Sequence, residues 1–134
     1  MMDDPLLSLY RSVGGEQPFY DLAAAFYVGV EAEPLLRPLY PNDLVDAKRH
    51  LALFLIQRFG GPATYSAERG HPRLRMRHMP FRIREAEKEA WLRHMSAALD
   101  ICPVFAPYRP EMQAYFDSTA AFLLNTDGAC PVRA

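Results

Sequence analysis

The chain has 134 residues, half of them hydrophobic, with a formal net charge of −1. This length suits one globular domain over residues 1–134, with a core over about residues 7–124, and is too short for two ordinary domains. The near-neutral charge argues against a protein that coats nucleic acid with its whole surface, although a local patch remains compatible with it.

The first half of the chain predicts two long helices. From Pro18 to Glu31, apolar residues recur at the spacing of one helical face, and the preceding Gly14-Gly15 pair predicts a sharp turn. The proline-rich segment LLRPLYPND then predicts an irregular crossover that contains Tyr40. A second helix is expected from Asp43, a candidate N-cap, to Arg58, and Gly60-Gly61-Pro62 ends it. Its expected inward stripe is Leu44, Ala47, Leu51, Phe54 and Leu55.

The second half predicts one short helix and two long ones. Pro72 and Pro80 limit any helix between them to about residues 74–79. A third long helix is expected over residues 85–101, with Trp91 on its apolar stripe, and a final one is marked by apolar residues from Met112 to Leu123. The tail from Asn125 is expected to fray. No segment shows a strand pattern, so the sequence predicts an all-α fold.

Residues 69–84, RGHPRLRMRHMPFRIR, contain six arginines and two histidines without a carboxylate. Apolar side chains alternate with the cationic ones, which indicates a partner that is both acidic and apolar. A haem has this character, because it combines a flat apolar ring, two propionates and an iron that needs an axial ligand. His78 lies on the proline-bounded helix and is the candidate ligand. A structural histidine in an apolar setting is the alternative.

The remaining histidines and the cysteines match no metal-binding or attachment motif. The four histidines form no HxxH or HExxH pair, so a zinc site is not expected. Cys102 and Cys130 lie outside any CxxC or CxxCH motif, which predicts reduced thiols and no covalent haem attachment. No apolar run is long enough to span a bilayer and no signal peptide is visible, so we expect a cytoplasmic protein without membrane association.

Three aromatic residues with polar tips come from separate elements: Tyr27, Tyr40 and Trp91. A buried hydroxyl or indole N–H needs a hydrogen-bond partner. Two interpretations remain open at this point. The three side chains either pack in the core with their tips bonded to backbone, or converge as donors on a ligand that accepts hydrogen bonds.

Motifs along most of the chain together resemble the truncated haemoglobins of group II. They are VGG at 13–15, FY at 26–27, LYP at 39–41, GGPATYS at 60–66, RGHPRLRMRHMPFRI at 69–83 and AWL at 90–92. The basic motif with its histidine, followed thirteen residues later by tryptophan, is the most specific of these. The resemblance implies a shortened globin, in which helices form a two-over-two sandwich around a haem.

The resemblance also implies roles for individual residues. His78 would be the proximal ligand of the iron in a non-covalently bound haem b, with its other ring nitrogen donating to a backbone carbonyl or a similar acceptor. Tyr27, Tyr40 and Trp91 would line the distal side and donate hydrogen bonds to bound O₂. The expected distal pocket residues are Ala47, Leu51 and Phe54, and the expected haem contacts and propionate partners are Arg77, Tyr65, His71, His50, Met76 and Phe81.

Arg77 is the strongest propionate candidate, because a guanidinium can hold a carboxylate through two bonds. His50 stands where related chains often have arginine or lysine, so its contact with a propionate is an open expectation. The neighbouring Arg73 and Arg75 cannot share one haem edge with Arg77. They are expected in solvent or paired with acids such as Glu85 and Glu87.

The leading functional hypothesis is a haem protein that binds O₂ and other diatomic ligands tightly, releases O₂ slowly, and uses it to convert nitric oxide or reduce peroxide. Such turnover needs an external reductase, since no flavin or nicotinamide motif is present. A non-catalytic oxygen store or sensor is the second hypothesis. A haem-free helical domain whose arginines hold nucleic-acid phosphates is the third. The sequence leaves a homo-oligomer open.

Overall fold

The structure is a computed structural model that describes residues 5–125. These residues form α-helices and 3₁₀ turns, and none of them is in a strand. The elements are η1 (Pro5–Ser8), α1 (Leu9–Ser12), α2 (Gln17–Glu31), η2 (Arg37–Leu39), α3 (Val45–Arg58), α4 (Thr64–Arg69), α5 (Leu74–His78), α6 (Glu85–Asp100), η3 (Pro103–Tyr108) and α7 (Arg109–Phe122). The predicted all-α class is confirmed.

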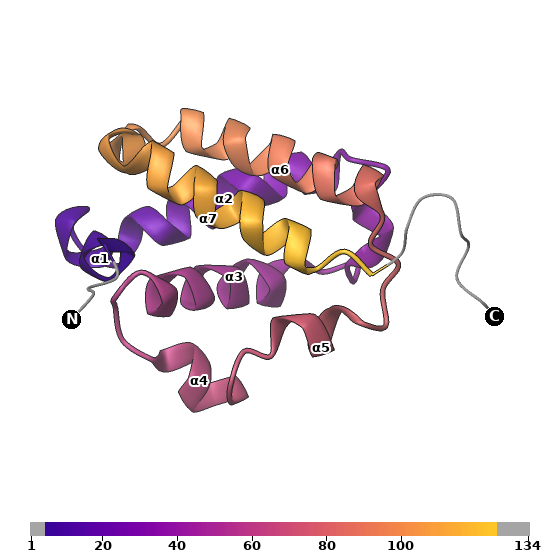
Figure 1. Cartoon of the computed structure of the whole chain (residues 1–134), viewed down its shortest axis with the longest axis horizontal. Helices are drawn as coiled ribbons and strands as arrows, with labels where there is room; N and C mark the ends of the chain where they lie inside the picture. The colour runs from indigo at the N-terminus through magenta and orange to yellow at the C-terminus, as the bar shows by residue number, and fades with distance from the viewer. Residues whose placement is uncertain (1–4, 126–134) are drawn as a thin grey trace.

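The four long helices α2, α3, α6 and α7 pack against one another through three interfaces. The α2 helix packs against α3 and α6, and α6 packs against α7. Figure 1 shows α2, α6 and α7 on one side of α3, with α4 and α5 on the other. This arrangement leaves one side of α5 facing the long helices.

Aromatic side chains hold the end of the sandwich near α1 together. Phe19 of α2 is fully buried, and its ring centroid lies 5.9 Å from that of Phe59 and 5.4 Å from that of Phe105. Full burial of a side chain of this size stabilises a fold by about 1.5–3 kcal/mol. These ring contacts join α2 to the segments that follow α3 and α6.

The predicted long helices are present, with boundaries that differ by up to three residues. The prediction of Asp43 as N-cap was wrong, because α3 begins at Val45 and Leu44 is its N-cap residue. Asp43 still satisfies a backbone N–H group at the start of α3, since its Oδ1 accepts the Val45 N–H at 2.9 Å. The final helix begins at Arg109, earlier than the Met112 pattern indicated, because Pro110 fits within its first turn.

Sequence reasoning missed the short helices α1 and α4. The α4 helix has six residues, and contacts from α3 hold it in place. Gln57 donates to the Ser66 hydroxyl and accepts its backbone N–H, at 2.8 and 3.0 Å. The Arg49 guanidinium donates two hydrogen bonds of 2.6 Å to the Glu68 carboxylate. A helix this short depends on such tertiary contacts. The spacing of apolar residues in the sequence does not reveal them.

The turn after α3 depends on one glycine. Gly60 has φ +101°, and a Cβ atom built there would lie 1.7 Å from the Leu7 carbonyl oxygen. Glycine is therefore required both by the backbone angle and by the close approach of the N-terminal segment. Within residues 5–125, no helix has the length and apolar character needed to cross a membrane.

Candidate functional site

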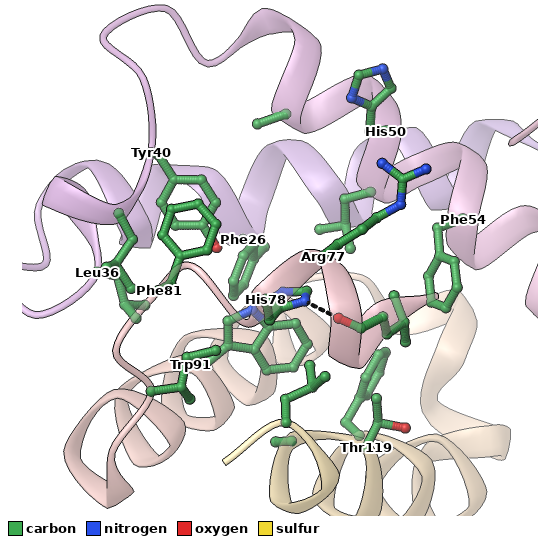
Figure 2. A pocket seen from close by; sticks show the side chains of 18 of the residues that line it. Phe26, Leu36, Tyr40, His50, Phe54, Arg77, His78, Phe81, Trp91 and Thr119 are labelled. Atoms are coloured by element: carbon green, nitrogen blue, oxygen red, sulfur yellow. Dashed lines mark hydrogen bonds between the residues drawn. The ribbon is translucent and has the colours of Figure 1, made fainter. Parts of the chain in front are cut away.

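A cavity of about 350 Å³ lies between the long helices and α5. This volume falls in the range of pockets that hold small molecules. Most of the side chains around it are aliphatic or aromatic. The α2 helix and the crossover contribute Phe26, Tyr27, Leu36 and Tyr40, and α3 contributes Ala47, His50, Leu51 and Phe54. Figure 2 shows side chains from these elements around the cavity, together with side chains from α5 and α6.

His78 lines the cavity from the end of α5. Its Nδ1 lies 2.6 Å from the Leu74 carbonyl oxygen, one helical turn earlier (Figure 2). A carbonyl only accepts hydrogen bonds, so Nδ1 carries the ring proton. In the neutral ring, Nε2 is then the nitrogen with the lone pair through which an imidazole binds a metal ion.

Tyr27, Tyr40 and Trp91 form a hydrogen-bonded group in the same cavity. The rings of Tyr27 and Tyr40 meet edge to face with centroids 5.4 Å apart. The Tyr27 hydroxyl donates to the Tyr40 oxygen, and so does the indole N–H of Trp91, which can only donate. The Tyr40 hydroxyl proton is used by neither bond and stays available to a further acceptor.

Burial keeps both phenols protonated. It raises the pKa of Tyr27, and the bond that Tyr27 donates to Tyr40 raises it further. Burial also raises the pKa of Tyr40, while the two bonds that this oxygen accepts pull the pKa partly back. Both side chains are therefore neutral hydrogen-bond donors at physiological pH. Their tips bond to one another and to Trp91, rather than only to backbone.

Cationic side chains from α4 and α5 reach the cavity beside His50. Arg69 Nη1 lies 3.3 Å from the His50 ring nitrogens. Burial, together with the Arg69 charge, lowers the pKa of His50, which favours its neutral form. Arg77 donates from Nε to the Pro72 carbonyl at 2.9 Å and from Nη2 to the Arg69 carbonyl at 2.7 Å. These bonds hold the Arg77 guanidinium at the cavity (Figure 2).

The structure brings most, but not all, of the expected residues together. Tyr65 and Phe81 line the cavity in addition to those already described. His71 and Met76 do not belong to the lining. His71 is exposed and accepts the Arg73 backbone N–H, and Met76 is 63% exposed on the outer side of α5. A helix of five residues presents one side inward, and Leu74, Arg77 and His78 occupy that side.

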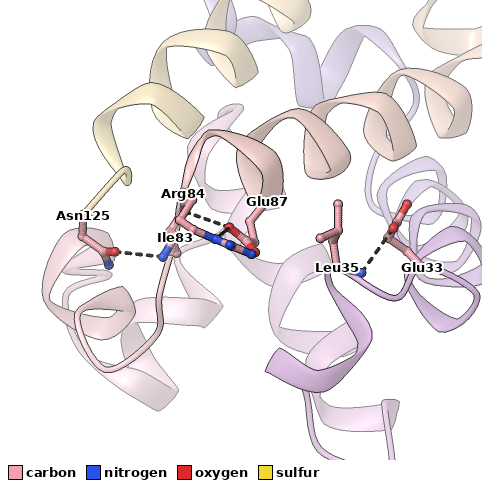
Figure 3. A network of polar contacts seen from close by, with 6 residues as sticks. All are labelled: Glu33, Leu35, Ile83, Arg84, Glu87 and Asn125. Carbon is pink, nitrogen blue, oxygen red and sulfur yellow. Dashed lines mark hydrogen bonds and ion pairs between the residues drawn. The ribbon is translucent and has the colours of Figure 1, made fainter. Parts of the chain in front are cut away.

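Arg73 and Arg75 are exposed to solvent, which is one of the two alternatives expected for them, and neither pairs with Glu85 or Glu87. Glu85 pairs with Lys88 at 2.6 Å, and Glu87 pairs with Arg84. The Glu87 carboxylate also accepts the Arg84 backbone N–H, so the pair caps the start of α6 (Figure 3). The Arg84 bond holds the pKa of the buried Glu87 carboxyl below its usual value.

Asn125 is a residue that sequence reasoning misjudged, because it is not frayed. Its Nδ2 donates to the carbonyls of His78 and Phe81 at 3.1 and 2.8 Å. Its Oδ1 accepts the Ile83 N–H at 2.8 Å (Figure 3), and its own N–H donates to the Ile83 carbonyl. The segment that follows His78 is thus tied to the end of α7. The rest of the tail, with Cys130, lies outside the described residues.

Comparison with known proteins agrees with this geometry. Residues 8–125 match the family of bacterial-like globins. The chain is 38% identical over 116 residues to group 2 truncated haemoglobin YjbI of Bacillus subtilis, covering 87% of each chain. The chain belongs to the group II truncated haemoglobins. Members of this family are haem-based oxygen-binding proteins, and the two-over-two fold predicted from the sequence is confirmed.

Solved structures of truncated haemoglobins and related haemoglobins match closely. The haemoglobin of Chloroflexus aurantiacus has a TM-score of 0.85 and 51% identity, covering 88% of this chain and 98% of that one. The truncated oxygen-avid haemoglobin of Bacillus subtilis has a TM-score of 0.83 and 37% identity, covering 87% of this chain and 98% of that one.

The residues of this chain fit the haem that the family implies. The cavity has mainly apolar walls, the imidazole of His78 with only its Nδ1 engaged by backbone, and cationic groups from Arg69 and Arg77. No cluster of three histidine, cysteine or acidic residues that could hold a metal ion occurs within residues 5–125. The described residues would therefore not complete the coordination of an iron by themselves, which fits a metal held in a macrocycle.

Replacing Asn125 with alanine should destabilise the protein. The change removes three side-chain hydrogen bonds, two of them partly buried, and leaves the Ile83 N–H and the His78 carbonyl without these partners. We expect a loss of about 2 kcal/mol in the free energy of unfolding, measured by urea titration. Asn42→Ala, in an exposed loop, is the control and should change the value by less than about 0.5 kcal/mol. Equal losses would contradict the assigned role.

Proposed function

We propose that the chain holds haem b without a covalent bond and that His78 is the axial protein ligand of its iron. The observation that carries this proposal is the bond from His78 Nδ1 to the Leu74 carbonyl, which leaves Nε2 as the ring nitrogen that can bind a metal ion at the cavity. No cysteine is among the described residues that line the cavity. When bound, haem supplies the iron that holds O₂ and exchanges electrons.

The cationic side chains would hold the propionates. Arg69 and Arg77 both line the cavity, and each keeps guanidinium donors beyond the contacts described above. His50 is held neutral beside Arg69, so it suits a hydrogen bond to a propionate better than an ion pair. Tyr65 is buried and its hydroxyl offers a further donor.

Tyr40 would donate a hydrogen bond to bound O₂. Trp91 and Tyr27 would keep the Tyr40 side chain in position. The two bonds that its oxygen accepts, which lower the pKa of Tyr40, would leave its own hydroxyl proton for the ligand. Accepting two bonds also makes that O–H a better donor. A hydrogen bond to an acceptor with partial charge is worth about 1.5–3 kcal/mol, so one such bond slows release by roughly one to two powers of ten.

Tight retention favours reaction of O₂ over its delivery. The relative from Bacillus subtilis described as oxygen-avid supports high affinity. We propose that the protein converts nitric oxide to nitrate, with the balance NO + O₂ + e⁻ → NO₃⁻, or reduces peroxide. The electrons come from an external reductase, because the chain has no flavin or nicotinamide motif. A store or sensor that holds O₂ without turnover is the alternative.

Replacing Trp91 with phenylalanine should speed O₂ release by about tenfold. The change keeps an aromatic ring but removes the N–H that bonds to the Tyr40 oxygen, which loosens the donor. The rate is measured by stopped-flow mixing of the oxygenated protein with carbon monoxide. Tyr108→Phe, which alters a ring outside the cavity lining, is the control and should leave the rate unchanged. An unchanged rate in Trp91→Phe would show that its N–H does not act on the ligand.

Mixing the oxygenated protein with nitric oxide separates an enzyme from a store. We expect rapid formation of one nitrate per O₂, followed by repeated turnover when a reductant and O₂ are supplied. Nitrate is measured directly in the mixture. Stoichiometric oxidation without recovery would overturn the catalytic proposal and leave the store or sensor.

A further inference from the structure

The outward side of α5 and its surroundings combine positive charge with exposed apolar side chains. We call this region the outer α5 surface, and it consists of Arg73, Arg75, Met76, Met79, Arg82 and Phe122. The three arginines are exposed, and Met76, Met79 and Phe122 are 63%, 60% and 53% exposed. Such an apolar patch within a charged border marks an interaction site.

The arginines of this surface lack carboxylate partners within residues 5–125. Of the six arginines in residues 69–84, Arg84 is the one that pairs with a carboxylate there. The two acids that flank this stretch in the sequence are engaged elsewhere, because Glu68 pairs with Arg49 and Glu85 pairs with Lys88. The basic stretch that the sequence predicted to need an anionic partner is therefore only partly used by the cavity.

The shape of the surface favours a protein as that partner. The Arg75 guanidinium lies 5.4 Å from the centre of the Phe122 ring, which fixes a cationic group on an exposed aromatic ring at the end of α7. Arginine, methionine and aromatic residues are the side chains enriched in protein interfaces. Phosphates of nucleic acid would engage the arginines but would leave the two methionines and Phe122 without a role.

We propose that the outer α5 surface docks an acidic electron-donor protein. The inference rests on the proposed function, whose turnover needs electrons from outside the chain. Leu74, Arg77 and His78 line the cavity from the inner side of the same five-residue helix, so a partner docked here lies one helix away from the cavity. With haem bound, the docked donor would supply one electron that reduces ferric iron to ferrous, and no bond would form or break.

Matched charge reversals test this docking with flavodoxin, an acidic flavoprotein, as the probe. Arg75→Glu/Arg82→Glu reverses two charges of the surface. Arg11→Glu/Lys48→Glu makes the same change in net charge with exposed cations outside it. Titration calorimetry of the haem-loaded protein with oxidised flavodoxin measures binding without electron transfer. We expect binding that weakens with salt, at least tenfold weaker binding in the first variant, and a change below about twofold in the control.

The rate of iron reduction supplies the second measurement. Reduced flavodoxin should reduce the first variant at least tenfold more slowly than the unaltered protein, while dithionite should reduce both at the same rate. Absence of flavodoxin binding, or equal weakening in both double variants, would overturn the docking proposal whatever the oxygen chemistry proves to be. Binding to vesicles of anionic lipid in place of flavodoxin would also overturn it. Docking without nitrate formation would leave the surface assigned and refute only the proposed turnover.

Discussion

The hydrogen bond from His78 Nδ1 to the Leu74 carbonyl decides which ring nitrogen faces the cavity. A helix as short as α5 has little stability of its own, so it must be held from outside. Arg77 bonds to carbonyls on its N-terminal side, and Asn125 bonds to carbonyls on its C-terminal side. These contacts fix the orientation of the imidazole before any ligand binds, and the proposed metal chemistry depends on that orientation.

On the other side of the cavity, polar side-chain groups lie among apolar walls. These groups need hydrogen-bond partners. A buried donor without a partner costs about 1–3 kcal/mol. Tyr27 and Trp91 avoid this cost by donating to Tyr40, and among the described residues no buried side-chain nitrogen or oxygen lacks a partner. The group is therefore stable without a ligand and still leaves one proton for it. Ordered donors that need little reorganisation bind charge best.

Helical periodicity predicted the four long helices because their apolar stripes are continuous. It missed α4, whose six residues are stabilised by Gln57 and Arg49 from another helix. It also missed the role of Asn125, whose partners lie 42 to 47 residues earlier in the chain. The resemblance implied Met76 as a haem contact, but on the five-residue helix α5 its side chain is exposed and outside the cavity lining. Contacts between residues far apart in the sequence are the part of the fold that the spacing of apolar residues does not predict.

The absorption spectrum of the purified protein tests the central claim, that His78 holds the haem, most directly. The unaltered protein should show a haem spectrum and, when reduced without ligand, five-coordinate ferrous iron. His78→Ala should abolish or severely weaken haem binding, while His71→Ala, at an exposed site outside the cavity lining, should leave the spectrum unchanged. A normal five-coordinate ferrous spectrum in His78→Ala would contradict the account.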